Sequence, residues 1–349
     1  MKKTVAFTSA ALNYLPKVRK LGASLRQHHP EFEVALALAD RRRDGVDFAR
    51  EPLDTVYALD DLPIEDRRRW TFFHTIVELS TAIKPFVLLE LLSQPDVERV
   101  LYFDPDMVLF SRLDDLMARL DHANVVLTPH LCEPEADLDA IRDNEISALK
   151  HGVYNLGFLG VRNTEEGRRF ARWWAERIYH FCVADIPAGL FTDQRWIDLA
   201  PAFFDGVDIL KSPRFNVATW NVTRRRIGGS LDAGFTVNGE PLGFYHFTGF
   251  DSGAHRVMAD KHGSGNPALD ALIGWYAEAT RLDDEDPVAH VPWAFGSYSD
   301  GTPIPLGHRR LYRLRPDLQA VYPDPFDASE GGLLRWMQTQ GPLEHPDFF

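Results

Sequence analysis

The segment Leu101–Phe110 reads LYFDPDMVLF and places two aspartates directly after an apolar run. The run begins at Arg99 (RVLYF), and its length and apolar character predict a buried strand. Asp104 and Asp106 follow it, and Pro105 stiffens the backbone between them. In open parallel α/β sheets, ligands bind beyond the carboxyl ends of the strands. The segment therefore predicts a sheet-based fold and a ligand site at one edge of its sheet.

Short apolar runs alternate with helical patterns on both sides of this segment, which is typical of βα units around a mainly parallel sheet. The predicted strands are Val5–Thr8, Val34–Ala39, Thr55–Ala58, Arg99–Phe103, Val125–Thr128, Gly152–Val161 (interrupted at Gly157), Phe235–Val237 and Leu242–Phe247. The predicted helices are Leu15–His28, Thr71–Leu79, Pro85–Leu92 and Glu165–Val183. The expected fold class is α/β, with helices flanking a Rossmann-like sheet.

Composition changes at Leu282–Pro287 (LDDEDP), an acidic stretch ending in proline that predicts a linker or a helix exit. Residues 1–281 are expected to form the main domain, with a division near residue 130. Residues 282–349 are rich in proline and aromatic side chains and show little periodicity. We expect them to form a small C-terminal appendage that packs on the main domain.

The overall charge and the apolar pattern limit the partners of the chain. Its 349 residues carry a formal net charge of -13, which repels nucleic acid. Only Cys132 and Cys182 are present, too few for a disulfide framework, so a cytoplasmic location is expected. No stretch approaches the ~18 apolar residues of a membrane span, although peripheral contact with the inner membrane face stays open.

The aspartate pair has three interpretations. Two carboxylates this close are costly to bury unless a cation neutralises them, which favours a divalent metal with open positions for phosphate oxygens. D-P-D is also good β-turn chemistry. Finally, the string Asp104-Pro-Asp106-Met-Val108 fits a haloacid-dehalogenase-like phosphatase, in which Asp104 would be a covalent nucleophile. The metal is favoured because apolar runs flank the pair. The phosphatase motif normally lies on the first strand of its domain, whereas several βα units come first here, and no convincing pair of a later lysine and an acidic motif follows at strand ends.

Four motifs in order give the chain its resemblance to GT-A glycosyltransferases, and most of all to the retaining, family 8-like group. These are the D-x-D pair itself, Asn155-Leu-Gly157, Asp193-Gln194 and His246-Phe-Thr-Gly249, with Ser80–Phe86 (STAIKPF) upstream resembling the helix whose basic residue faces the donor. The resemblance covers about residues 1–265, and it implies that residues 1–130 form a nucleotide-sugar half and residues 131–281 an acceptor half of the main domain. It implies a GT-A fold and the transfer of a sugar from a nucleotide diphosphate donor, with UDP as the expected nucleotide.

The resemblance also assigns roles to residues. Asp104, Asp106 and His246 would hold the metal, and this mixed set of oxygen and nitrogen ligands suits Mn²⁺ better than Mg²⁺. Asp193 and Gln194 would lie beside the reacting carbon. The donor would be bound by Thr8, Asn13, Asp40, Lys84, Asp104, Asn155, Gly157, Gly249 and Lys261. Lys261 is the first lysine after His246, where the family has a lysine that grips the diphosphate, but here the K-P-W of that motif is missing.

Each assignment has a structural alternative. His246 could be a hydrogen-bonded core histidine, Asp193 a helix N-cap, Lys84 a solvated residue before a helix, and Asn155 a residue satisfied by a backbone carbonyl. A non-catalytic nucleotide-sugar-binding module is a further class that the motifs allow. The acceptor is expected to be a glycan, a lipid-linked glycan or a protein, as in polysaccharide biosynthesis.

Overall fold

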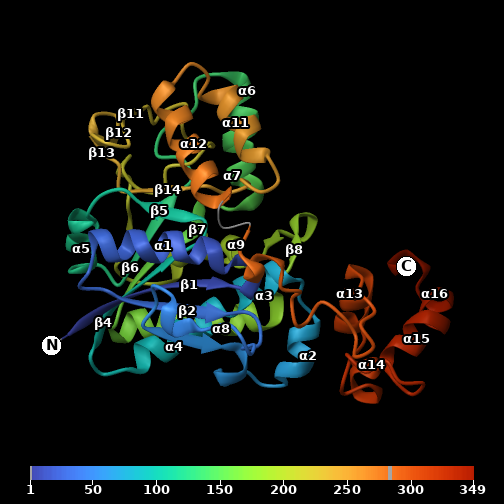
Figure 1. Cartoon of the computed structure of the whole chain (residues 1–349). Coiled ribbons are helices and arrows are strands. Elements are labelled where there is room, and N and C mark those ends of the chain that lie inside the picture. The colour runs from blue at the N-terminus through green and yellow to red at the C-terminus, as the bar shows by residue number, and fades with distance from the viewer. Residues whose placement is uncertain (1, 282–284) are drawn as a thin grey trace.

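The computed structural model describes residues 2–281 and 285–349, so half of the predicted linker, at 282–284, lies outside the described residues. Its centre is a seven-stranded sheet in the order β10-β6-β7-β4-β1-β2-β3 (Figure 1). The strands are β1 (Lys3–Ala10), β2 (Glu33–Leu38), β3 (Thr55–Ala58), β4 (Val97–Phe103), β6 (Val125–Pro129), β7 (Tyr154–Arg162) and β10 (Val207–Ile209). β7 runs antiparallel to β4 and β6, and the other pairs are parallel. The predicted α/β class with a mainly parallel sheet is confirmed.

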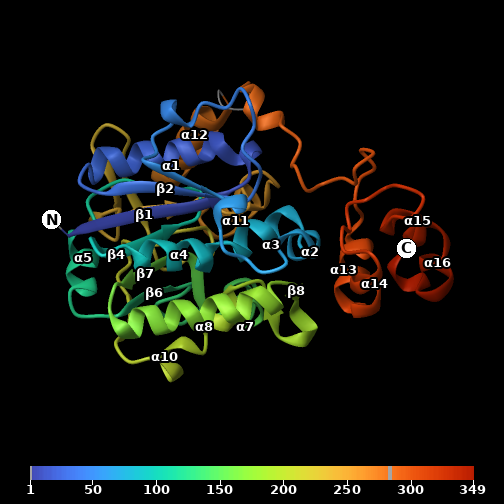
Figure 2. The same cartoon turned by 90° about the horizontal axis from the view of Figure 1, so that it is seen from below.

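Helices cover both faces of this sheet because β4 alternates its side chains between two apolar clusters. Val100 and Tyr102 join the cluster that contains α4 (Lys84–Ser93) and α8 (Glu165–Phe181). Leu101 and Phe103 join the one that contains α1 (Leu15–His28) and α5 (Asp114–Leu120). Figures 1 and 2 show α1 on one side of the sheet and α4 and α8 on the other. Because β4 is buried on both faces, its carboxyl end is held rigidly.

A second, smaller unit lies on the same side of the sheet as α1, at the top of Figure 1. It comprises the antiparallel strands β11 (Ile227–Ser230), β12 (Gly234–Val237) and β13 (Glu240–Pro241), together with α6 (Leu138–Ala140), α7 (Ile146–His151), α11 (Ala254–His262) and α12 (Pro267–Arg281). It is joined to the sheet by a two-stranded ribbon of β5 (Met107–Leu109) and β14 (Phe244–His246). Short elements complete the main body: α2 (Arg67–Phe72), α3 (Ile76–Ala82), β8 (Ala184–Asp185), β9 (Leu190–Phe191), α9 (Gln194–Ile197) and α10 (Ala200–Phe203).

The C-terminal residues form short helices that the sequence did not predict: α13 (Leu306–Leu314), α14 (Pro316–Val321), α15 (Leu333–Thr339) and α16 (Gly341–Glu344). Prolines begin or separate them, so no window is long enough to show a 3.6-residue period. Phe72 on α2 packs against the rings of Tyr298, Tyr312 and Phe326, with centroids 5.9, 5.2 and 5.2 Å away. This aromatic cluster is continuous with the core beneath the sheet.

Two sequence predictions were wrong in detail. The helix expected over Thr71–Leu79 is broken into α2 and α3, because Thr75 caps α3: its hydroxyl accepts from the amide of Glu78, and the Glu78 carboxylate accepts from that of Thr75. The break expected at Gly157 is absent, and β7 runs without interruption from Tyr154 to Arg162. Glycine at position 157 has a packing reason, described below.

Candidate metal and donor site

The two aspartates occupy a tight turn at the end of β4. The amide of Met107 donates to the carbonyl oxygen of Asp104 at 3.0 Å, with Pro105 at the second position of the turn. The turn feeds directly into β5, whose antiparallel partner β14 aligns His246 with Met107. The amide of Phe247 then donates to the carbonyl of Asp106 at 2.9 Å. The β-turn and the metal site, which the sequence offered as alternatives, are therefore compatible, because the turn directs both carboxylates toward one point.

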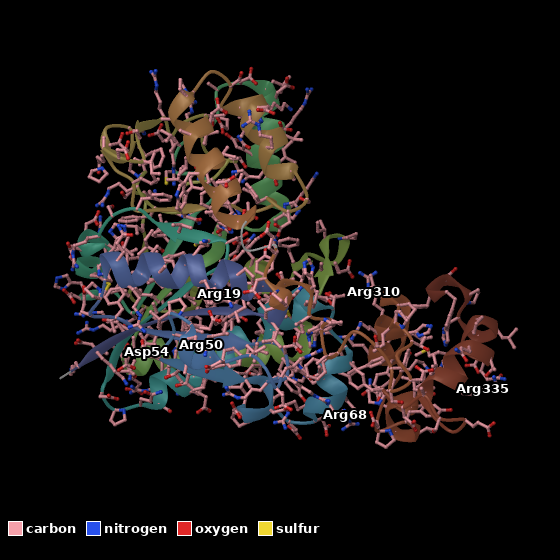
Figure 3. The ribbon with its side chains drawn as sticks, viewed as in Figure 1. Arg19, Arg50, Asp54, Arg68, Arg310 and Arg335 are labelled. Carbon is pink, nitrogen blue, oxygen red and sulfur yellow. The ribbon has the colours of Figure 1, made fainter. Side chains whose placement is uncertain are left out.

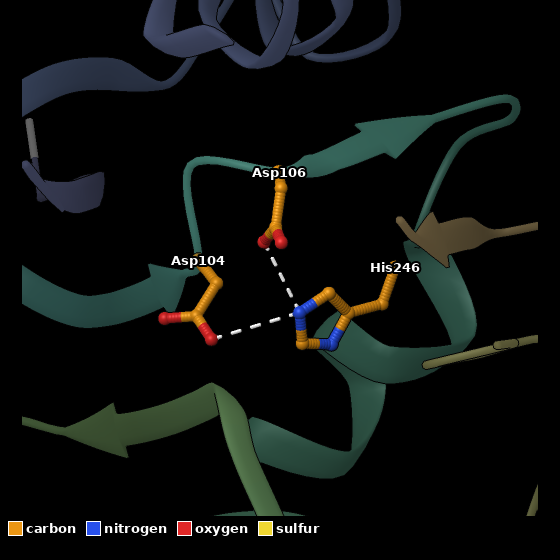
Figure 4. Close-up of side chains that lie close together, drawn as sticks. All are labelled: Asp104, Asp106 and His246. Atoms are coloured by element: carbon orange, nitrogen blue, oxygen red, sulfur yellow. Dashed lines mark ion pairs between the residues drawn. The ribbon is translucent and has the colours of Figure 1, made fainter. Parts of the chain in front are cut away.

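Asp104, Asp106 and His246 converge there (Figure 4). The imidazole Nε2 lies 3.1 Å from Asp106 Oδ1 and 3.7 Å from Asp104 Oδ2. One ligand atom from each residue lies within 4.8 Å of the others. Two carboxylate oxygens and one imidazole nitrogen form a donor set that fits a divalent cation with open positions. The chemistry and spacing of these residues thus fit the metal that the sequence predicts.

The protonation of these groups reflects their mutual attraction. Burial acts to raise the pKa of Asp106, but His246 and, more weakly, Lys17 outweigh it and hold the pKa below its ordinary value. For His246, burial acts to lower the pKa, and the charges of Asp106 and Asp104 outweigh it and raise the pKa above 6.5. The imidazole and the two carboxylates therefore attract each other, and each favours the charged form of the other. A bound cation would compete with a proton for His246.

Lys84 is a buried cation between two carboxylates. Its ammonium lies 3.3 Å from Asp104 Oδ1 and 3.4 Å from Asp193 Oδ2, and 4.3 Å from the centre of the Tyr102 ring. Its side chain is 7% exposed and that of Asp193 is 4% exposed. Burial acts to lower the pKa of Lys84, but the two aspartates outweigh it and raise the pKa. Lys84 is therefore a charged residue of the site and not a solvated one.

The carboxylate of Asp193 is in a less favourable environment for its charge than the ammonium of Lys84 is. Burial raises the pKa of its carboxyl to about 6, with Lys84 opposing the rise and Asp104 adding to it. The Asp193 side chain accepts no cap hydrogen bond at the start of α9. The N-cap alternative is thus not what the structure shows.

Gln194 and Asn155 hold each other in a network of buried amides. The Gln194 side-chain oxygen accepts from the amide of Leu156 at 3.0 Å and from Asn155 Nδ2 at 3.2 Å, and Gln194 Nε2 donates to the carbonyl of His151 at 3.0 Å. Asn155 Oδ1 accepts from Asn216 Nδ2 at 3.0 Å and from the amide of Gly157 at 3.2 Å. Both side chains are fixed in orientation, so the protein itself satisfies the groups that the sequence assigned to the sugar.

A cavity of about 920 Å³ opens in front of these residues. The predicted residues that line it are Asn13, Lys84, Asp104, Asp106, Asn155, Gly157, Asp193, Gln194 and His246. Thr8, Asp40, Gly249 and Lys261 do not line it. The structure thus brings most of the predicted site residues together around one cavity, although they are spread along the chain from Asn13 to His246.

The residues left outside the cavity have other contacts. The carboxylate of Asp40 accepts from the backbone amides of Leu12, Arg41 and Ala294, so it ties the end of β2 to the C-terminal segment. Lys261 pairs with Asp143 on the smaller unit. Gly249 has a φ of 70°, which serves the turn after His246. Thr8 is buried, and its hydroxyl has no hydrogen-bond partner among the described residues.

The sequence analysis missed a second buried cation, Lys17 on α1. Its ammonium binds both carboxylate oxygens of Asp251 and donates to the Tyr14 hydroxyl at 3.1 Å, and that hydroxyl donates to Asp251 at 2.9 Å. Tyr14 and Asp251 line the cavity. The available signal was a lysine between Pro16 and Val18 on the apolar face of the predicted helix. His130, Asn216 and Trp220 were also missed, because they lie in irregular loops without a recognisable pattern.

Gly157 is required by close packing at the site. A Cβ at this position would lie 2.7 Å from Asn155 Oδ1, His246 Cε1 and Met107 Cε. The imidazole has no second anchor, because its buried Nδ1 has no hydrogen-bond partner among the described residues. Gly157→Ala is therefore expected to push the ring aside and weaken Mn²⁺ binding at least ~10-fold, as for a displaced metal ligand. Free Mn²⁺ measured by electron paramagnetic resonance during a titration checks this.

Gly274→Ala is the matched control, since a Cβ at that helical glycine meets nothing within 4 Å. Unchanged Mn²⁺ affinity in Gly157→Ala would show that His246 is not a ligand.

The fold and site together define a class: a mainly parallel α/β protein with a two-carboxylate, one-imidazole centre at its strand ends. No protein-family model matches the chain. It is similar to two uncharacterised proteins of Bacillus subtilis (strain 168). YfnD is 26% identical over 250 residues, which cover 70% of this chain and 76% of YfnD. YfnF is 27% identical over 176 residues, which cover 50% of this chain and 57% of YfnF.

Solved structures with a distant similarity include two glycosyltransferases. The galactosyltransferase LgtC, in complex with donor and acceptor sugar analogues, has 18% identity and a TM-score of 0.43, covering 80% of this chain and 95% of that one. The glycosyltransferase GlyE of Streptococcus pneumoniae TIGR4 has 16% identity and a TM-score of 0.45, covering 80% of this chain and 64% of that one. At this level of similarity the activity has to be argued from the site itself.

Proposed function

We propose that this protein is a divalent-metal-dependent glycosyltransferase. It takes a sugar from a nucleotide diphosphate sugar, with UDP as the nucleotide and Mn²⁺ as the metal, and transfers it with retention to a glycan, lipid-linked or protein acceptor. The observation that carries the proposal is the convergence of Asp104, Asp106 and His246 at the edge of a large cavity, with Lys84 buried beside them.

The residues of the site suit a leaving diphosphate. A metal bound by the triad would stabilise the negative charge that develops on the phosphate oxygens. Lys84 is already fixed next to Asp104, so it adds positive charge without reorganisation. Lys17 lies close enough to Asp106 to lower its pKa, and it takes the place of the cation that the sequence analysis sought in Lys261.

The nucleotide would lie against the carboxyl end of β1. Ser9, Asn13 and Tyr14 line the cavity there, in the segment that connects β1 to α1. This is where ligands of open α/β sheets bind. The sugar would then extend past the metal toward Asp193 and Gln194, which line the same cavity.

Retention of the configuration at the sugar carbon is supported by the fact that the carboxylates lining the cavity already have partners. An inverting enzyme needs a carboxylate base on the face opposite the leaving group, as inverting glycosidases do. Among the described residues that line the cavity, five carry carboxylates, and all five have partners. Asp104 and Asp106 face His246, Asp193 pairs with Lys84, Asp251 binds Lys17, and Glu78 caps α3.

Thermal unfolding in the presence of UDP-, GDP- and dTDP-sugars, each with and without Mn²⁺, tests the proposal. At least one nucleotide sugar is expected to raise the unfolding temperature only with Mn²⁺, because ligand binding to the folded state stabilises it. Slow Mn²⁺-dependent hydrolysis of the same donor should accompany this. Turnover of p-nitrophenyl phosphate with a phosphoaspartate at Asp104 would instead support the phosphatase, and binding without hydrolysis the non-catalytic module.

A further inference from the structure

The C-terminal helix α13 contributes to the wall of the cavity. Leu306 and Arg310 line it, although they lie far along the chain from the metal triad. α13 is anchored beside β8, because Arg313 donates to the carbonyls of His180 and Cys182, the latter at 3.1 Å. The C-terminal segment is thus part of the site and not only a support for the sheet.

The three arginines of α13 have different surroundings. Arg309 donates to the carbonyl oxygens of Phe72 and Phe295 at 3.0 and 2.6 Å, and Arg313 holds the segment before β8. Arg310 is exposed and makes no ion pair or hydrogen bond with the described part of the chain. Figure 3 shows Arg310 beside the space between α13 and β8. The arginine that faces the cavity is therefore the one left without a structural role.

Arg310 is also electrostatically distinct within the cavity. The only other lysine or arginine among its described lining residues is Lys84, which lies beside the metal triad and pairs with Asp104 and Asp193. A planar guanidinium with free donors binds phosphate or carboxylate oxygens in a two-pronged geometry. The donor's own diphosphate is accounted for by the metal triad and Lys84. A second anion thus has a binding group ready on the α13 wall.

We propose that Arg310 binds a phosphate group of the acceptor substrate. This inference rests on the proposed glycosyl transfer and specifies its acceptor as a phosphate-bearing molecule. Two cavity-lining residues, Val77 on α3 and Leu306 on α13, are 67% and 43% exposed and offer apolar surface in the same cavity. The acceptor phosphate could belong to a free sugar phosphate or to a lipid-linked one. The apolar surface would contact the lipid chain of a lipid-linked acceptor.

Calorimetric binding in the presence of UDP and Mn²⁺ tests this with three probes: glucose 1-phosphate, its decyl ester and decyl glucoside. The two phosphate probes are expected to bind the wild-type protein more tightly than the neutral glucoside. Arg310→Ala should weaken both at least ~10-fold, the loss expected when a hydrogen bond to a charged group is removed, and leave the glucoside unchanged. Arg335→Ala is the matched control, an exposed arginine on the outer side of the C-terminal helices (Figure 3). Tighter binding of the decyl ester than of glucose 1-phosphate would assign the phosphate to a lipid-linked acceptor, and equal binding to a soluble one.

The inference is overturned if the phosphate probes bind no more tightly than decyl glucoside, or if Arg310→Ala binds them as the wild type does. Loss of UDP–Mn²⁺ binding in Arg310→Ala would also overturn it, since Arg310 would then belong to the donor. A wild-type protein that fails to bind UDP with Mn²⁺ would instead refute the proposed function.

Discussion

Asp106→Asn is expected to abolish the Mn²⁺-dependent thermal shift with the nucleotide sugar and to lower kcat for donor hydrolysis by about 10³-fold, the upper range for loss of one preorganised electrostatic contact. The amide keeps the shape of the side chain but removes the charge that a hard cation requires. Asp106 Oδ1 lies 3.1 Å from the nitrogen of His246, so one substitution disturbs two ligands. Thermal unfolding and release of the free nucleotide, each with and without Mn²⁺, measure the effect.

Asp121→Asn provides the control, because Asp121 is an exposed aspartate paired with Arg99 and lies outside the cavity lining. It should retain the full Mn²⁺-dependent shift. If Asp106→Asn retained that shift as well, the assignment of the metal to this triad would be wrong.

Lys84→Met is expected to lower the free energy of unfolding by about 3–5 kcal/mol, the range for removing one partner of a buried ion pair. It leaves the carboxylates of Asp104 and Asp193 without the cation between them. The loss should become smaller from about pH 8 to about pH 5, because a buried carboxyl with a raised pKa binds its proton more readily in the folded than in the unfolded state. Urea unfolding at several pH values measures the effect.

The double variant Lys84→Met/Asp193→Asn separates stability from function. Removing both charges is expected to restore the free energy of unfolding to within about 1 kcal/mol of the wild type, since a buried pair replaced by neutral groups is often tolerated. Donor hydrolysis should stay low in both variants, because Lys84 no longer faces the leaving group. Recovery of activity in the double variant would show that Lys84 acts only as a structural counter-charge.

The elements around the aspartate pair were predictable because each carries a local signal. β1, β2, β3 and β4 are short apolar runs, and α1 was predicted with the bounds that it has, because Pro16 and the spacing of Leu15, Val18, Leu21 and Leu25 define it. The convergence of Asp104, Asp106 and His246 was predicted from motif order. These three residues could be predicted to converge because Asp104 and Asp106 follow a strand and His246 ends one.

The predicted site residues that lie outside the cavity are ones whose neighbours are set by tertiary packing. Asp40 has the right residue type at a strand end, but its carboxylate is used by the amide of Ala294, more than 250 positions away. Lys261 was chosen because it was the next lysine in the sequence, whereas the buried cation near Asp106 is Lys17 on α1. No local pattern distinguishes a lysine that faces a distant loop from one that faces water.

Among the described helices, none has the length and apolar character needed to cross a bilayer.

The pairing of β5 with β14 has a consequence for how the protein is made. Asp106 and His246 become neighbours only when two strands separated by more than 130 residues have joined, so a nascent chain emerging from the ribosome holds its aspartates long before their partner is synthesised. Manganese uptake should then report completion of this long-range step during biogenesis. Prematurely terminated products that end before β14 should be unable to take up the ion at this centre.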